Sequence, residues 1–254
     1  MVLDFNSKHT LADRFADLID RAIDEGAKQE QRREYLGGSA IGEPCLRRLQ
    51  YEYMDAPKDE GGDFNARTRR IFYRGHQCED WVANWIRNAG FNLRTEKNGR
   101  QFGFEDCDGR FKGHVDGVIV EAPEGFTAPA LWEHKTLGTK GFASLKRHGI
   151  AKAYPKYAAQ VATYQAYMQL AENPAFFTAL CADTMEIHLE LVPFDQPLAQ
   201  ACIDKAAQIL TACDHGETLP RASDDPASFV CKFCPFQAIC HSPNQNTGSG
   251  GAWE

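Results

Sequence analysis

Two short segments decide how this chain is interpreted: Gly113-His114-Val115-Asp116-Gly117-Val118-Ile119-Val120 and Leu131-Trp132-Glu133-His134-Lys135. Both are rich in apolar residues, as buried β-strands are, yet each contains a carboxylate. Because successive side chains of a strand point to opposite faces, Glu133 and Lys135 share one face and His134 points to the other. A buried carboxylate is costly without a partner. We therefore expect Asp116, from a strand position, to lie beside Glu133.

Two carboxylates next to a lysine suit metal-assisted hydrolysis. They can hold a hard divalent cation such as Mg²⁺, and Lys135 can orient or help deprotonate an attacking water. An isolated Glu-x-Lys is more often an ordinary surface arrangement of opposite charges. Here a helical segment follows, with Tyr157, Gln160 and Tyr164 on one stripe. A glutamine on such a stripe needs a polar partner, which favours a site over a plain core.

The remaining patterns predict a mixed α/β domain. Helical spacing occurs at residues 11–23, about 64–89, 155–170 and 196–213, and a short helix begins at Pro44. Strand patterns cover residues 91–95, 101–105, 111–120, 130–135, 175–181 and 185–192. This order favours an α/β fold with helices flanking a mixed sheet. We expect a helical segment at 1–62, a core at 63–215, a cysteine segment at 216–241 and a disordered tail at 242–254.

Composition and hydropathy indicate an ordinary globular protein and disfavour a membrane-spanning or secreted one. The 254 residues are 43% hydrophobic and 25% charged, as in ordinary globular proteins. The sequence contains no membrane-length apolar run and no secretory signal pattern, so we expect a cytoplasmic protein. The net charge of −7 disfavours a polyanion partner overall. Residues 134–171 nevertheless hold six cations and no acid, and residues 67–74 hold four arginines, so either solvated faces or a phosphate-binding surface is predicted.

Four of the nine cysteines form a second motif. Cys231, Cys234 and Cys240 are spaced C-x2-C-x5-C, and three thiols this close can converge on one metal centre. Cys45 is the best candidate for a fourth ligand, with His241 as the alternative. Zinc and an iron–sulfur cluster both accept four cysteines, so spacing alone does not distinguish them.

The first set of motifs resembles the PD-(D/E)xK nuclease superfamily, specifically its RecB-like exonuclease branch. The resemblance rests on Asp116, then Glu133-His134-Lys135, then Gln160-x-x-x-Tyr164. It implies a restriction-endonuclease-like fold in which the two acids hold Mg²⁺ or Mn²⁺ and Lys135 positions the water. It also implies that Gln160 and Tyr164 lie beside the site, near DNA.

The resemblance further implies a metal ligand from the helix before the sheet. Glu79 and His76 lie three residues apart on one helical face, and the carboxylate is slightly preferred for Mg²⁺. In the family several residues usually separate a glycine from this histidine, whereas Gly75 directly precedes His76 here.

The cysteine motif is similar to the iron–sulfur clasp of AddB-type helicase–nucleases and of CRISPR-adaptation nucleases. It implies that Cys45, Cys231, Cys234 and Cys240 bind a 4Fe–4S cluster that joins the two helical ends. Together the resemblances imply a DNA exonuclease acting on single strands or DNA ends, of phage or CRISPR-adaptation type, with a recombination or CRISPR-adaptation protein as candidate partner. The alternative is a non-catalytic DNA-binding or adaptor protein that keeps the fold and cluster.

Overall fold

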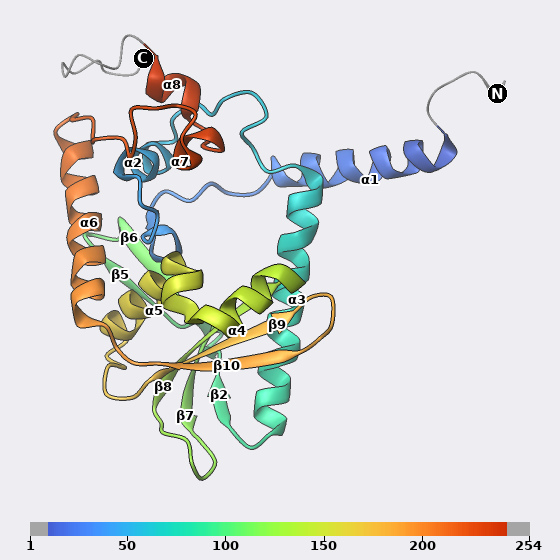
Figure 1. Cartoon of the computed structure of the whole chain (residues 1–254), viewed down its shortest axis with the longest axis vertical. Coiled ribbons are helices and arrows are strands. Elements are labelled where there is room, and N and C mark those ends of the chain that lie inside the picture. The colour runs from blue at the N-terminus through green and yellow to red at the C-terminus, as the bar shows by residue number, and fades with distance from the viewer. Residues whose placement is uncertain (1–9, 243–254) are drawn as a thin grey trace.

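The computed structural model describes residues 10–242 and has the predicted α/β character (Figure 1). Its helices are α1 (Leu11–Ala27), α2 (Leu46–Met54), α3 (Ala66–Asn88), α4 (Thr139–Ala153), α5 (Pro155–Tyr167), α6 (Gln196–Asp214), α7 (Phe229–Lys232) and α8 (Gln237–His241), with a 3-10 turn, η1, at Gly38–Ala40. Its strands are β1 (Leu36–Gly37), β2 (Asn92–Arg94), β3 (Glu96–Lys97), β4 (Arg100–Gln101), β5 (Gly103–Asp106), β6 (Phe111–His114), β7 (Gly117–Glu121), β8 (Ala130–Leu137), β9 (Ala175–Cys181) and β10 (Ile187–Val192).

The two segments quoted at the start lie in two sheets of one body. The larger has the order β10-β9-β8-β7-β2, in which β8 and β9 run parallel and the other neighbours antiparallel. The smaller has the order β1-β6-β5. Strand β8 lies at the centre of the larger sheet and is buried over most of its length, as expected of a strand covered on both faces.

The predicted continuous strand at residues 111–120 is wrong. It breaks at Val115 and Asp116, and the two halves, β6 and β7, belong to different sheets. Val115 is fully buried at the break, so the apolar pattern continues although the pairing does not. Asp116 therefore lies at the crossing from one sheet to the other rather than inside a strand.

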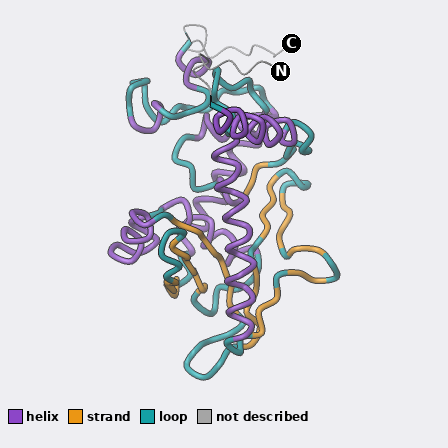
Figure 2. The backbone as a smooth tube through the Cα atoms, turned by 90° about the vertical axis from the view of Figure 1, so that its right-hand side faces the viewer, coloured by secondary structure: helices purple, strands orange, loops and turns teal. Residues whose placement is uncertain are grey.

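Helices cover both faces of the larger sheet. Helix α3 packs on one face through Cys78, Val82 and Ala83, against a layer that includes Trp132 of β8. Helices α4 and α5 pack on the other face, and α6 packs against α5, within a larger core. Figure 2 shows α3 running along the length of the molecule, from the end that carries α1 to the opposite end. Within residues 10–242 no helix is both long enough and apolar enough to cross a membrane.

The N-terminal and C-terminal helical segments pack together at one end of the molecule (Figure 1). The guanidinium of Arg47 in α2 donates to the carbonyl oxygen of Leu219 at 2.6 Å, and the amide of Gln50 donates to that of Glu217 at 2.6 Å. The backbone N–H of Ala238 donates to the carboxylate of Asp59 at 2.9 Å. These bonds join the chain ends directly. Residues 243–254 of the predicted disordered tail lie outside the described range, and the four-part division of the chain stays a prediction.

Candidate functional site

Glu133 of β8 is the centre of a buried polar group. Its side chain is fully buried, and its Oε1 accepts from the Lys135 ammonium at 2.5 Å and from the Gln160 amide of α5 at 2.5 Å. The polar partner expected for Gln160 is thus Glu133 itself. The second oxygen, Oε2, is buried and has no hydrogen-bond partner within residues 10–242. A buried carboxylate oxygen without a partner is costly unless a ligand satisfies it.

Asp116 approaches the same group from the crossing between β6 and β7. Its carboxylate accepts from the backbone N–H of His134 at 2.7 Å, which ties it to β8 next to Glu133. The imidazole of His134 points to the opposite face, where its Nδ1 lies 3.0 Å from the hydroxyl of Thr178. Burial, reinforced by the ammonium of Lys135, lowers the pKa of His134 to about 3, so the ring is neutral.

Helix α3 brings Glu79 to this side of the sheet. Glu79 and Asp116 both line a pocket of about 230 Å³, and Glu79 is half-buried there. His76, one helical turn earlier, is exposed but close enough to act electrostatically on Asp116. Both sequence candidates for the helix ligand therefore lie on the side of α3 that faces Asp116.

Burial raises the pKa of all three carboxyl groups, and neighbouring carboxylates add to the shifts of Glu133 and Glu79. Burial, with a contribution from Asp116, raises the pKa of Glu133 to about 8, although Lys135 opposes the shift. Burial and then Asp116 raise the pKa of Glu79 to about 7. Burial likewise raises the pKa of Asp116. For Lys135 burial opposes the charged form, but Glu133 and Asp116 outweigh it and hold the ammonium pKa above its usual range. Three acids thus share a site with a single ammonium.

The other predicted site residues lie nearby. Tyr164 is buried, and its hydroxyl shares a hydrogen bond with the side chain of Gln160. The ammonium of Lys135 lies 5.3 Å from the ring centroid of Tyr157. Thr178, which holds His134, was missed by sequence reasoning; the only signal for it was a single hydroxyl within the apolar strand at 175–181.

Ion pairs neutralise part of each of the two basic stretches. Two of the four arginines at residues 67–74 pair with acids of α1: Arg69 with Asp24 at 3.8 Å, and Arg70 with Asp20. In the second stretch Lys156 pairs with Glu43 at 2.6 Å, while α4 carries Lys140, Lys146, Arg147 and Lys152 on its surface. The exposed basic surface is therefore mainly that of α4, a helix that sequence reasoning did not identify.

The carboxylate group fits a divalent cation. The orphaned Oε2 of Glu133 and the raised pKa values of three neighbouring acids both indicate missing positive charge. Carboxylate oxygens are the ligands that Mg²⁺ and Mn²⁺ prefer. As the side chains stand, no three His, Cys, Asp or Glu residues among those described are arranged to hold a metal ion.

The four motif cysteines line a second, separate cavity. Cys45 of the α2 segment and Cys231, Cys234 and Cys240 of the C-terminal segment all face it, together with His241. The guanidinium of Arg47 lies 3.8 Å from the sulfur of Cys240. Four thiols around one cavity are a soft donor set that suits zinc or an iron–sulfur cluster. The cysteines are free thiols in this structure.

Comparisons with known proteins agree on the fold. The solved alkaline exonuclease of Laribacter hongkongensis superposes with a TM-score of 0.51 and 15% identity, covering 72% of this chain and 90% of that one. The same enzyme in complex with dAMP gives a TM-score of 0.50, again at 15% identity, with the same coverage of both chains. At this identity the likeness shows the fold alone. No sequence among the curated proteins matches. The family model of the PD-(D/E)XK nuclease superfamily matches residues 8–241.

Proposed function

Because the chain belongs to the PD-(D/E)XK nuclease superfamily, we propose that it is a metal-dependent DNA exonuclease that hydrolyses phosphodiester bonds. The observation that carries the proposal is the buried group of Glu133, Lys135 and Gln160 beside Asp116. A fully buried acid with one unsatisfied oxygen has no structural use that an apolar residue would not serve better.

Each residue has a separate role in this proposal. Asp116 and Glu133 hold Mg²⁺ or Mn²⁺, with Glu79 as a third ligand and His76 as its alternative. When bound, the cation stabilises charge on the phosphate and the leaving oxygen. Lys135, fixed by Glu133, orients the attacking water. Gln160 keeps the Glu133 carboxylate in place, and Tyr164 supports Gln160 from α5.

The finer parts of the proposal rest on the resemblance of the motifs. We assign the protein to DNA processing or recombination of phage or CRISPR-adaptation type, acting in the cytoplasm with a recombination or CRISPR-adaptation protein as partner. A solved structure of this fold is an alkaline exonuclease, and exonuclease activity for this chain rests on the resemblance of its motifs to the RecB-like branch. The common cavity supports a metal centre held by Cys45, Cys231, Cys234 and Cys240, and its assignment as a 4Fe–4S cluster rests on the resemblance of the C-x2-C-x5-C motif.

The test is digestion of end-labelled linear and circular DNA, single- and double-stranded, with Mg²⁺, Mn²⁺ or EDTA. We expect metal-dependent loss of linear DNA with circles spared. Lys135→Ala and Asp116→Ala should each abolish cleavage while DNA binding persists, and Lys28→Ala, which removes an exposed cation outside both basic stretches, is the matched control. Cleavage by either site variant at the wild-type rate would refute the assignment of these residues.

The adaptor alternative makes the opposite prediction. A folded protein that binds DNA but degrades none of these substrates with either metal would favour a non-catalytic role. The complete set of two acids and a lysine argues against it, because a binding protein has no need for a buried carboxylate–ammonium pair at 2.5 Å.

A further inference from the structure

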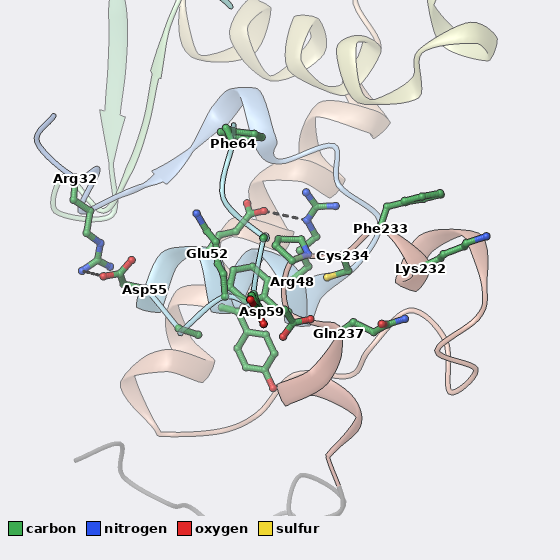
Figure 3. Close-up of a pocket in the computed structure, with 18 of the residues that line it drawn as sticks. Arg32, Arg48, Glu52, Asp55, Asp59, Phe64, Lys232, Phe233, Cys234 and Gln237 are labelled. Carbon is green, nitrogen blue, oxygen red and sulfur yellow. Dashed lines mark hydrogen bonds and ion pairs between the residues drawn. The ribbon is translucent and has the colours of Figure 1, made fainter. Parts of the chain in front are cut away.

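A cleft of about 800 Å³ opens beside the cysteine cavity, and none of its lining residues belongs to the candidate catalytic group. It lies between α2, the loop that precedes α3 and the C-terminal cysteine segment, as the close-up in Figure 3 shows. Its lining includes five cations, four carboxylates and two exposed rings: Arg32, Arg33, Arg48, Lys58, Lys232, Glu52, Asp55, Asp59, Glu60, Phe64 and Phe233.

Exposed phenyl rings lie in and next to this cleft: Phe64 and Phe233 line it, and Phe229 neighbours Phe233. Phe233 is 72% exposed and Phe229, one helical turn away on α7, is 85% exposed, and their ring centroids lie 6.2 Å apart. Phe64, from the loop before α3, is 57% exposed. Neighbouring exposed rings have no use in the stability of a fold and indicate a binding surface.

Some charged side chains of the cleft form ion pairs and others do not. Arg32 pairs with Asp55 at 3.2 Å, Arg48 with Glu52 at 3.0 Å and Lys58 with Asp63 at 2.6 Å. Arg33 and Lys232 form no ion pair within residues 10–242. Instead their cationic groups lie near aromatic rings, 6.0 Å from the centroid of Tyr35 and 5.6 Å from that of Phe233. Asp59 and Glu60 of the lining form no ion pair within that range either, so the two cations next to rings share the cleft with two carboxylates.

The cleft is connected to the catalytic side of the molecule. Glu43 is buried between Lys156 of α5, at 2.6 Å, and Arg48 of the cleft wall, at 3.4 Å. Helix α5 also carries Gln160, which contacts Glu133. The ion pairs of Glu43 therefore connect the wall of the cleft to helix α5, which carries Gln160 of the candidate catalytic group.

We propose that this cleft, with the rings of Phe229 and Phe233, binds single-stranded DNA outside the catalytic group. Bases stack on the two rings, and Arg33 and Lys232 contact the phosphates. The proposal rests on the proposed function for its ligand. Exposed rings next to cations suit a single strand, because its bases are free to stack whereas those of a duplex are not. The charged lining disfavours an apolar peptide.

The experiment measures binding of a labelled oligo-dT of about 16 nucleotides by fluorescence anisotropy. It uses the full chain in the Lys135→Ala background without added divalent metal, so that no strand is cut. Phe229→Ala combined with Phe233→Ala should raise the Kd about tenfold or more, since stacking on each ring is lost. Phe15→Ala is the matched control, because it removes a similarly exposed ring from α1. Circular dichroism checks that each variant is folded.

An abasic strand of the same length separates stacking from charge. It should bind the wild-type protein and the double variant equally and weakly, because it has phosphates but no bases. Binding of oligo-dT by the double variant at the wild-type Kd would overturn the proposal. Equal binding of the abasic strand and oligo-dT by the wild-type protein would overturn it as well, as would a blunt duplex that competes as well as a single strand.

The outcome is distinguishable from that of the nuclease proposal. If wild-type protein degrades no DNA but the double variant loses oligo-dT binding, the nuclease proposal fails and the cleft stands. If wild-type protein degrades DNA and the double variant binds normally, the cleft alone is refuted.

Discussion

At the scale of single residues, the environment of Glu133 determines what the site can do. One oxygen of the Glu133 carboxylate accepts hydrogen bonds from both an ammonium and an amide. These bonds fix the direction of the other oxygen, which is available for a ligand. Because Gln160 is an amide rather than a second cation, it orients Glu133 without neutralising it. The site thus retains excess negative charge, shared among Glu133, Asp116 and Glu79.

This shared charge makes the stability of the metal-free protein depend on pH. Burial and Asp116 raise the pKa of Glu79 to about 7, so the folded protein binds more protons than the unfolded chain. For an acid with a raised pKa, stability is therefore lost as pH rises from about 4.5 through 7. We expect the Tm without divalent metal to fall between about pH 5 and pH 8 through this contribution. Adding Mg²⁺ should raise the Tm more at about pH 8 than at about pH 5.

Glu79→Gln tests the origin of this dependence. The variant should lose less Tm over the same pH range and be a few degrees more stable than wild type at the upper end. Asp80→Asn is the matched control, because Asp80 is exposed on the same helix and contributes least to the shift of Glu79. Thermal unfolding followed by circular dichroism measures both. An unchanged pH profile for Glu79→Gln would show that Glu79 does not interact with the other acids.

At the scale of elements, close packing of β6 against α5 positions the catalytic helix. A Cβ atom added to Gly113 of β6 would lie 2.6 Å from a ring carbon of Tyr164 in α5 and even closer to the ring of Phe104. The helix that carries Gln160 can therefore approach the small sheet only because this strand has no side chain at that position.

Two glycine substitutions separate this packing from backbone effects. Gly113→Ala should destabilise the protein by about 1–3 kcal/mol, the usual cost of overpacking, and should lower activity by displacing Tyr164. Gly75→Ala places the same methyl group in open space on α3, where nothing lies within 4 Å. It should be neutral or stabilise by about 0.5–1 kcal/mol, because alanine favours helix. Chemical denaturation measures both, and similar values for the two would refute the packing argument.

The elements also show where sequence reasoning succeeds. Helices α1, α3 and α6 and strands β8 and β9 follow strong periodic patterns, and the structure confirms each within a few residues. Helix α4 was missed because its stretch is dominated by cations and is interrupted at Gly149, which has a φ of 71°. The break at Asp116 was missed because both halves of the segment are buried, so hydrophobicity does not reveal a change of sheet. Residue spacing indicated the acids and lysine, but only the structure shows that Gln160 contacts Glu133.

At the scale of the whole molecule, the two chain ends form one unit around the cysteine cavity. The hydrogen bonds from Arg47, Gln50 and Ala238 link segments that are more than 160 residues apart in sequence. Tyr51, Phe236 and Cys240 form a small separate core between them. So small a core contributes little free energy by itself, and a bound metal centre would supply the rest.

Cys234→Ser should therefore loosen this end of the molecule while leaving the α/β core folded. We expect loss of bound iron and of colour in protein purified without oxygen, and rapid protease cleavage within residues 216–241. Cys107→Ser, which changes a half-buried thiol outside the cavity, is the matched control. A colourless wild-type protein that contains zinc would refute the 4Fe–4S assignment but leave the nuclease proposal intact. Unchanged proteolysis of Cys234→Ser would refute a structural role for the cavity.

The pairing of the chain ends also has a consequence for biosynthesis. Cys45 leaves the ribosome 186 residues before Cys231, an interval of about 10–40 s at ordinary elongation rates. During that time every residue of the α/β core emerges, whereas α2 still lacks the segment that covers it. The cysteine cavity is thus completed after the α/β core, and a chain that stops before Cys231 carries the catalytic candidates without the finished cavity.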